Sequence, residues 1–413
     1  MDGQVKTDAK LVEILNQNGD SLMQSVLKNP AAYRYQIIYT RIDRDRRNKP
    51  SFTNFYYNVD SKRYFNPASV VKMPLAFLSL EKLNQLRSKG VDKFTGMEFD
   101  SSWSRQSKLK LDSTSENTKP SIAHFIKKAF LISDNDAYTR MYEFVGQQSI
   151  NSRMHGMGYN DTRITRRFVR MNEEENRHTN QVRFVKSDGS VIYTQPPQYN
   201  TDSFDFSQIN RMGKGYINAQ DSLINEPIDF TKANSYPLED MQQTLQSVMF
   251  PKSVAAKQRF ELTKDDYAYL YRYLSQYPSE TDYPKYDTTA FYDSYVKFFF
   301  RQGNRLMPKD VRVFNKVGWA YGCLTDVSYV VDFKNRIEFM LAVTIYVNND
   351  GILNDDKYEY DSIGWPFLYK VGQTIYQHEL KRERNFKPDL KNFQLKYTPR
   401  SNDGRKAVKD VDN

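Results

Sequence analysis

Ser69 and Lys72 lie three positions apart, and their types and spacing suit nucleophilic catalysis. On a helix this spacing places both side chains on the same face. A serine hydroxyl is a poor nucleophile until a neighbouring base takes its proton. A lysine amine acts as that base where burial and nearby cations lower its pKa. We therefore predict that Ser69 is an acylated nucleophile and that Lys72 is its base.

A second motif, Ser133-Asp134-Asn135, lies in a predicted turn between two helices. We expect its serine to pass a proton between Lys72 and a leaving nitrogen. Taken alone, such a run is more often an ordinary helix start, and an isolated Ser69 is more often a helix cap. The motifs together favour a catalytic site, because all three occur in the same chain and in an order that suits the chemistry.

A third motif, Lys316-Val317-Gly318, lies on a predicted strand near the end of the chain. The charge of Lys316 would steer an anionic group of the substrate, and Gly318 would leave room for the substrate along the strand. The backbone N–H groups of Ser69 and Trp319 are the expected oxyanion donors. With this motif the sequence predicts an acyl-transfer site with four catalytic side chains: Ser69, Lys72, Ser133 and Lys316.

This combination resembles the penicillin-recognising serine enzymes, the class A β-lactamases and penicillin-binding proteins, whose motif trio it follows. The resemblance spans roughly residues 10 to 380 and is carried by the segments 65–72, 132–137 and 316–331. It implies a β-lactamase/transpeptidase-like fold and the roles given above. It also implies that Asn135 binds the amide of the substrate.

One departure from the family pattern concerns deacylation. Residues 163–172 resemble the omega-loop segment, and Phe168 stands where the family carries its deacylating glutamate. Asn172, which in the family helps to hold the hydrolytic water, is retained. We therefore expect slow attack of water on the acyl-enzyme. The run of glutamates at 173–175 leaves two alternatives open: one of them replaces the missing carboxylate, or all three lie in a solvated loop.

A second departure is Val317, because the family has a hydroxyl residue there that helps to hold the carboxylate of the substrate. We place Val317 with Asn135, Asn172, Gly318 and Trp319 among the substrate-binding residues. The loss of the hydroxyl weakens the case for penicillins and for peptides that end in D-Ala. The span from Asn172 to Lys316 is also longer than is usual in the family, which predicts a remodelled rim of the cleft.

Hydrophobic periodicity predicts strands mainly near the two chain ends and helices between them. The expected helices cover 9–27, 69–86, 122–132, 136–144, 238–248, 264–274, 291–302 and 361–380. The expected strands cover 33–42, 52–59, 311–319, 326–332 and 337–347, with a hairpin at 182–193. Residues 195–235 are polar, and no regular structure is predicted for them.

This order predicts an α+β fold: an α/β sandwich plus an all-helical subdomain. One antiparallel sheet would be built from both chain ends and flanked by the terminal helices. We assign 9–68 and 305–382 to the α/β subdomain. The mostly helical subdomain is 69–304, with an inserted hairpin and an extended loop near 180–235, and 383–413 is a polar C-terminal tail.

Composition narrows the classes of partner and cofactor. The single cysteine excludes an internal disulfide, and the four scattered histidines lack metal-ligand spacing, so neither a metal nor a cofactor is expected. The formal net charge is +10, with no recognisable nucleic-acid module, which favours an anionic cell-envelope surface over nucleic acid. No apolar run reaches the roughly 18 residues of a membrane span. A periplasmic or secreted location is expected, with the leader apparently absent from this sequence.

Three functions remain open. The first is a β-lactamase-like hydrolase that acts on an amide or ester, with β-lactams as the first substrates to test. The second is a cell-wall D-Ala peptidase or transpeptidase, for which slow attack by water is no defect. The third is a β-lactam or peptidoglycan sensor that is acylated once and does not turn over. The expected partner is thus a small-molecule or peptide substrate, and the sequence leaves the oligomeric state open.

Overall fold

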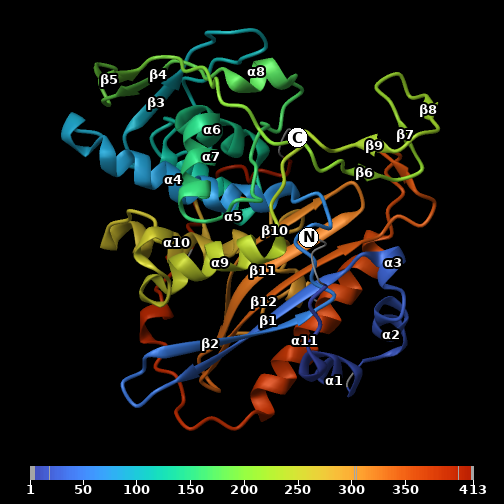
Figure 1. Cartoon of the computed structure of the whole chain (residues 1–413). Coiled ribbons are helices and arrows are strands. Elements are labelled where there is room, and N and C mark those ends of the chain that lie inside the picture. The colour runs from blue at the N-terminus through green and yellow to red at the C-terminus, as the bar shows by residue number, and fades with distance from the viewer. Residues whose placement is uncertain (1–4, 18, 302, 304, 399, 411–413) are drawn as a thin grey trace. The chain divides into compact units, whose positions relative to one another are not determined.

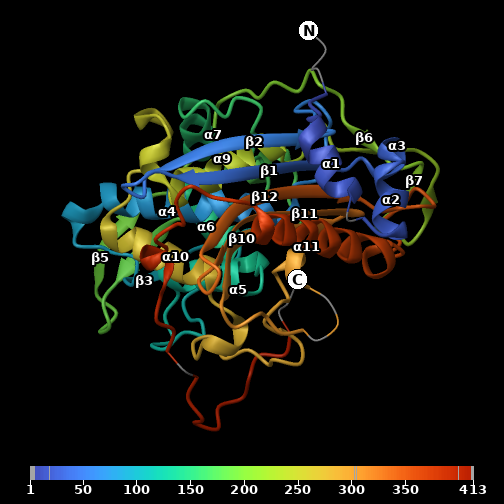
Figure 2. The same ribbon diagram turned by 90° about the horizontal axis from the view of Figure 1, so that it is seen from below.

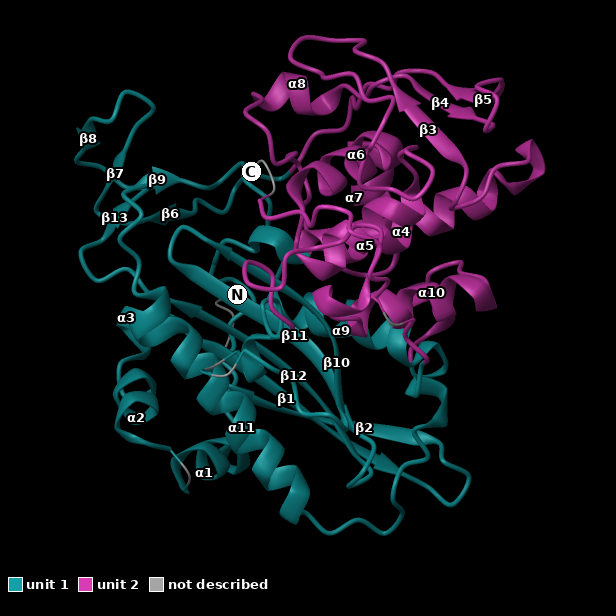
Figure 3. Cartoon of the chain, turned by 180° about the vertical axis from the view of Figure 1, so that it is seen from behind, with its two compact units in different colours: residues 1–70, 205–253, 294–395 teal, residues 71–204, 254–293, 396–413 magenta. Residues whose placement is uncertain are grey.

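The computed structural model describes residues 5–17, 19–301, 303, 305–398 and 400–410. The chain folds into two compact units (Figure 3). Unit 1 comprises residues 1–70, 205–253 and 294–395, and unit 2 comprises 71–204, 254–293 and 396–413. Each unit is therefore assembled from three separate segments of chain.

The centre of unit 1 is a five-stranded antiparallel sheet with the order β10-β11-β12-β1-β2. Its strands are β1 (Gln36–Arg44), β2 (Pro50–Tyr57), β10 (Val311–Ala320), β11 (Cys323–Asp332) and β12 (Ile337–Tyr346). The two ends of the chain meet where β1 pairs with β12, with Ile38 opposite Ala342. Every residue of β11 is buried, as expected for a strand covered on both faces.

Helices cover both faces of this sheet (Figures 1 and 2). On one face α1 (Ala9–Gln17), α2 (Ser21–Leu27) and α11 (Trp365–Lys381) form one apolar core with side chains of the sheet. The short α3 (Pro30–Tyr33) links α2 to β1. On the other face α9 (Leu238–Met249) packs against β1, β11 and β12, and Gln242 Nε2 donates to Thr40 Oγ1 at 3.0 Å. The apolar stripes predicted from periodicity thus form the two inner surfaces of a three-layer sandwich.

Unit 2 is organised around α4 (Lys72–Gln85), which is buried along almost its whole length. It packs against α5 (Ile122–Leu131) and α6 (Asn135–Val145), and the unit also holds α7 (Gln147–Gly156), α8 (Glu173–Arg177) and α10 (Lys264–Ser275). A small antiparallel sheet joins β3 (Gly96–Phe99) to the hairpin of β4 (Val182–Val185) and β5 (Val191–Gln195). The hairpin predicted at 182–193 is therefore confirmed, and β3 is its third strand.

Two predicted helices differ from the structure. The helix predicted over 9–27 is two helices, because Gly19 interrupts the pattern and Asp20 caps a new start by accepting from the N–H of Met23. The helix predicted over 291–302 is wrong in the described residues: only a 3-10 turn, Phe298–Phe300, forms there. Its three phenylalanines are buried against α11, where a Cβ on Gly372 would lie 2.5 Å from Cβ of Phe299. Gln302 lies outside the described residues.

The division into units also differs from the predicted domain bounds. Residues 205–253 belong to unit 1 rather than to the helical part. They contain the short strands β6 (Arg211–Met212), β7 (Gly215–Ile217), β8 (Leu223–Ile224) and β9 (Ile228–Asp229). A parallel pairing of β7 with β13 (Ile352–Leu353) ties this segment to the C-terminal half of unit 1. Local periodicity does not reveal a pairing between strands of two or three residues that lie more than a hundred positions apart.

The described residues of the C-terminal segment, 396–398 and 400–410, pack into unit 2 instead of extending as a free tail. The guanidinium of Arg400 donates to the carbonyls of Thr281 and Tyr286 at 3.1 and 2.8 Å, and also to that of Pro278. Val408 forms a parallel bridge with Tyr286. The polar composition that predicted a tail instead supplies the donors for these carbonyls.

The structure confirms the α+β class and the antiparallel sheet built from both chain ends and flanked by helices. Within the described ranges no helix has both the length and the apolar character needed to cross a bilayer.

Candidate active site

The candidate nucleophile, Ser69, is partly exposed at the start of a helix. The 3-10 turn η1 (Ala68–Val71) runs directly into α4. Asn66 Oδ1 accepts from the N–H of Ala68 at 2.8 Å, and Ala68 has a left-handed φ of +43°. Such a conformation costs a residue with a Cβ on the order of 1 kcal/mol, so the surrounding contacts must hold it. The turn that presents Ser69 is therefore fixed before the helix begins.

Strand β10 lies directly against this turn within unit 1. A Cβ on Gly318 would lie 2.6 Å from the carbonyl oxygen of Pro67 and 3.0 Å from the amide nitrogen of Ser69. Only glycine permits so close an approach of two backbones. The predicted oxyanion donors, the N–H groups of Ser69 and Trp319, therefore belong to backbone segments in contact. The close approach makes Gly318 a packing requirement, in addition to the room for substrate predicted for it.

The other predicted residues of β10 differ in their surroundings. Lys316 is buried, and its Nζ donates to the carbonyl of Val317 at 2.7 Å. The side chain of Val317 is fully buried in the apolar core of unit 1, so it is not placed to contact a substrate as predicted. The half-buried ring of Trp319 packs edge-on against Tyr295 and tilted against Phe298.

Lys72, the predicted base, is fully buried at the first position of α4 in unit 2. Its Nζ donates to Asn135 Oδ1 at 2.7 Å and to the carbonyl of Ser133, and Ser133 Oγ lies 3.4 Å away. Burial lowers the pKa of this amine to about 7, although the carboxylate of Asp134 acts in the opposite direction. The structure thus brings Lys72, Ser133 and Asn135 together and makes the amine a base near neutral pH.

The Ser133-Asp134-Asn135 motif is held by its own backbone and by a buried charge network. Ser133 has a left-handed φ of +67°, and Asp134 caps α6 by accepting from the N–H of Ala137 at 2.7 Å. Asp134 also lies 3.4 Å from the ammonium of Lys128. The ordinary helix-start role and the catalytic role of this motif are therefore compatible, because the cap formed by Asp134 fixes the positions of Ser133 and Asn135.

Phe168 covers Lys72. The centroid of its ring lies 5.0 Å from the ammonium, and the ring stacks on Tyr138 with centroids 4.3 Å apart. An aromatic face therefore occupies the position at which the family pattern places a carboxylate. Sequence reasoning found the substitution but not this contact, which brings together residues almost a hundred positions apart.

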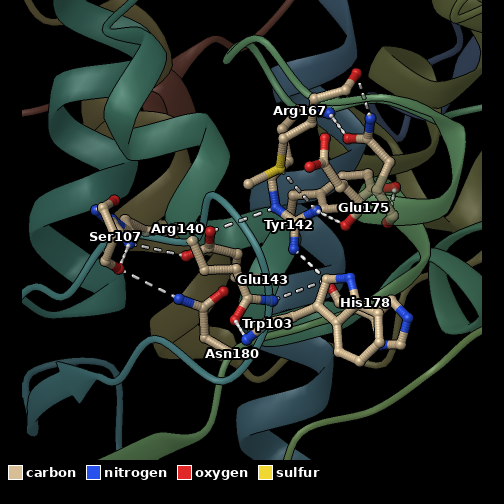
Figure 4. Close-up of polar contacts among 12 residues, drawn as sticks. Trp103, Ser107, Arg140, Tyr142, Glu143, Arg167, Glu175, His178 and Asn180 are labelled. Carbon is tan, nitrogen blue, oxygen red and sulfur yellow. Dashed lines mark hydrogen bonds and ion pairs between the residues drawn. The ribbon is translucent and has the colours of Figure 1, made fainter.

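The segment that carries Phe168 is anchored from inside unit 2 (Figure 4). Arg167 is fully buried; its Nε lies 3.3 Å from Glu143, which also pairs with Arg140 at 3.0 Å. Its other nitrogens donate to the carbonyls of Glu175, at 3.1 Å, and His178. Because a buried guanidinium is costly without partners, these contacts fix the backbone next to Phe168.

The acidic run after Phe168 is engaged elsewhere. Asn172 caps α8 by accepting from the N–H of Glu175 at 2.8 Å, and Glu175 accepts in return from the N–H of Asn172. Glu174 contacts His178 and Tyr199, and Glu173 lies 3.7 Å from Arg177. The structure therefore uses the run as the first turn of a helix, where acids are stabilised by the helix dipole.

The chemistry-bearing residues thus form two groups, each described within its own unit. Unit 1 holds Ser69, Lys316, Gly318 and Trp319, whereas unit 2 holds Lys72, Ser133, Asn135 and Phe168. In the described ranges, no group of three or more His, Cys, Asp and Glu side chains is arranged to bind a metal ion.

Comparison with known families supports the reading of these motifs. The model of the beta-lactamase enzyme family matches residues 23–192, a segment that contains Ser69, Lys72, Ser133 and Phe168. Over this part the chain is β-lactamase-like. The resemblance predicted from the motifs is therefore confirmed there. A search of curated proteins found no match.

Solved structures similar to this chain include β-lactamases from several bacteria. A β-lactamase from Sphaerobacter thermophilus is 12% identical, with a TM-score of 0.46 and coverage of 87% of this chain and 97% of the other. A β-lactamase from Francisella tularensis is 16% identical, with a TM-score of 0.46 and coverage of 87% and 98%. A PBP-A variant in an acyl-enzyme complex with penicillin G is 12% identical, with a TM-score of 0.46 and coverage of 89% and 96%.

Proposed function

We propose that this protein is a serine hydrolase that forms an acyl-enzyme on Ser69 with an amide or ester, a β-lactam or a related compound, and releases it slowly. The observation that carries the proposal is the environment of Lys72. Its amine is fully buried, has a pKa of about 7 and is hydrogen-bonded to Asn135. A structural surface lysine would have none of these properties.

In the acylation step, neutral Lys72 takes the proton of the Ser69 hydroxyl while the serine oxygen bonds to the carbonyl carbon of the substrate. The N–H groups of Ser69 and Trp319 stabilise the oxyanion. The carbon–nitrogen bond then breaks, and Ser133 passes the proton from Lys72 to the leaving nitrogen. For a β-lactam the leaving nitrogen stays attached as part of the opened ring.

Deacylation requires a base for water, and Phe168 provides none. Its ring lies over Lys72, and the neighbouring glutamates are bound to other partners. The acyl-enzyme is therefore proposed to persist, because a general base typically contributes a factor of about 10² to 10⁴ to such a step.

The test is intact-protein mass spectrometry over a time course with a penicillin and a cephalosporin. We expect a persistent adduct on the parent protein and none on Ser69→Ala, with both proteins showing the same thermal unfolding. An adduct of equal yield on Ser69→Ala would overturn the assignment of the nucleophile. The absence of any adduct, without consumption of the β-lactam, would exclude these rings as substrates.

Replacing the ring that covers Lys72 tests the proposed cause of slow release. Phe168→Glu is expected to shorten the lifetime of the adduct at least about tenfold, because it supplies a carboxylate beside Lys72. Phe168→Leu is the matched control, since it changes the shape of the side chain without adding a base. Equal lifetimes in the two variants would mean that the side chain at this position does not limit deacylation.

Two other functions share the same acylation chemistry. Phe168 favours them over an efficient β-lactamase, because both tolerate slow deacylation. One is a cell-wall D-Ala peptidase or transpeptidase, and the other is a sensor that does not turn over. Release of D-Ala from a stem peptide without β-lactam turnover would support the peptidase or transpeptidase. A stoichiometric adduct with neither activity would support the sensor.

We also propose a periplasmic or secreted protein that lies at the cell-envelope surface. The formal net charge of +10 supports this proposal, because cationic proteins are attracted to anionic polymers. The test is binding to isolated cell envelopes at increasing salt concentration, and we expect the binding to weaken. Binding that does not change with salt would contradict an electrostatic attachment.

A further inference from the structure

Three aromatic rings from distant parts of the chain contact one another in series on unit 2. We call Trp103, His178 and Tyr199 the aromatic platform. The indole of Trp103 and the imidazole of His178 are nearly parallel, with centroids 3.8 Å apart and planes at 9° (Figure 4). Tyr199 follows His178 by 21 positions in the sequence, and its ring is tilted against that of His178 with centroids 4.5 Å apart. His178 is thus in contact with both of the other rings.

The two partners of His178 remain open to solvent. Trp103 is 46% exposed and Tyr199 is 45% exposed. One face of the indole is covered by His178, so the exposed area belongs to the rest of the residue. Within the described residues neither ring has a further aromatic contact. Aromatic side chains that serve only packing lose most of their exposure, so this arrangement indicates a surface prepared for a ligand.

The aromatic platform is held in place by hydrogen bonds from its own unit. The side chain of Gln106 accepts from the N–H of Trp103 at 2.9 Å and donates to the carbonyl of His178 at 3.3 Å. The same carbonyl accepts from the buried guanidinium of Arg167. The platform therefore exists before any ligand arrives, which lowers the entropic cost of binding.

An exposed carboxylate contacts two of the rings, and an exposed guanidinium belongs to a residue two positions after Trp103 in the chain. Glu174 is 55% exposed and lies 3.2 Å from His178 Nε2 and 3.3 Å from the hydroxyl of Tyr199. Arg105 is 65% exposed, and its Nε lies 3.5 Å from Glu175. An exposed carboxylate accepts from hydroxyl groups and an exposed guanidinium donates to oxygen atoms, so this part of unit 2 offers both kinds of hydrogen bond.

We propose that the aromatic platform binds a carbohydrate, with a pyranose ring of a cell-wall-type glycan lying flat on Trp103. A pyranose has an apolar face of C–H groups that suits an indole, and a rim of hydroxyl groups that suits Glu174 and Arg105. A second aromatic ring would match the indole equally well but has no hydroxyl groups to bond to Glu174 or Arg105. Binding of a glycan to these rings forms no covalent bond, so it is measured without any reaction at Ser69.

The test is a titration of the whole protein with a soluble β-1,4-linked oligomer of N-acetylglucosamine, in which isothermal titration calorimetry measures the binding. We expect saturable binding that weakens at least about tenfold in Trp103→Ala, which corresponds to ~1.4 kcal/mol. Tyr199→Ala is expected to weaken binding less, because it removes the support of His178 and not the proposed contact face.

Phe94→Ala is the matched control, because Phe94 is also an exposed aromatic of unit 2, at 56%, and packs edge-on against Tyr269. It should bind the oligomer as the parent does. Absence of binding by the parent, equal loss in Phe94→Ala, or unchanged binding in a folded Trp103→Ala would each overturn the proposal. Displacement of the oligomer by phenylacetamide at equal concentration would show an aromatic site instead.

Discussion

At the scale of single residues, the chemistry of Lys72 comes from its surroundings. A lysine amine in water has a pKa near 10.5, and removal from water disfavours its charged form. Phe168 and the packing of α4 remove the water, whereas Asp134 partly restores the preference for charge. The net result is a pKa of about 7, where the neutral and charged forms are both populated at neutral pH.

This pKa predicts the pH dependence of acylation. Because only the neutral amine accepts the proton of Ser69, the acylation rate should rise with pH and level off above about 7. Single-turnover adduct formation, measured by mass spectrometry at pH values from about 5 to about 9, follows this directly. A midpoint close to the ordinary lysine value would contradict the assignment of Lys72 as the base.

Asp134→Asn tests the sign of the electrostatic effect. The carboxylate of Asp134 raises the pKa of Lys72, so its removal should move the midpoint of acylation to lower pH. Asparagine retains the helix cap that Asp134 provides to α6. A midpoint that moves to higher pH, with unchanged thermal unfolding, would show that another group dominates the field at Lys72.

At the scale of secondary structure, the close approach of β10 to the turn before Ser69 positions the nucleophile. Gly318→Ala would place a methyl group 2.6 Å from the carbonyl of Pro67. We expect the strand or the turn to shift, at a cost of about 1–3 kcal/mol in stability, with loss of most acylation. Denaturant unfolding and adduct formation measure the two effects separately.

Gly156→Ala is the control for this substitution. Gly156 ends α7, and a Cβ there would meet nothing within 4 Å. Its acylation rate should equal that of the parent, and its stability should be unchanged or slightly higher. If Gly318→Ala behaved in the same way, the contact between β10 and the turn would not matter for the chemistry.

At the scale of the whole molecule, distant segments complete each unit. The end of the chain belongs to unit 2, where Arg400 binds backbone carbonyls of the 278–286 loop. Arg400→Ala leaves these partly buried carbonyls without their donor. It should lower the free energy of unfolding by about 1–3 kcal/mol.

A second tail variant separates this effect from surface charge. Lys409 is 80% exposed and lies 3.9 Å from Asp287, so Lys409→Ala should change the stability by less than about 0.5 kcal/mol. Thermal unfolding of both variants gives the comparison. Equal stability of Arg400→Ala and the parent would mean that the C-terminal segment contributes little to unit 2.

The sequence by itself determined the features that depend on neighbours along the chain. The spacing of Ser69 and Lys72, the alternation in the strands and the helix start at residues 133–135 are local patterns, and local patterns predict local structure. The resemblance of residues 163–172 to the family's omega-loop segment also implied the missing carboxylate, because Phe168 stands at its position.

The tertiary structure alone decided what depends on contacts between distant segments. Examples are the ring of Phe168 over Lys72, the burial of Val317 in the core and the pairing of β7 with β13. The helix predicted over 291–302 fails for the same reason, since burial of Phe298–Phe300 against α11 outweighs helix propensity. Burial removes water and creates contacts between residues far apart in sequence, and these long-range effects leave no periodic signal in the chain.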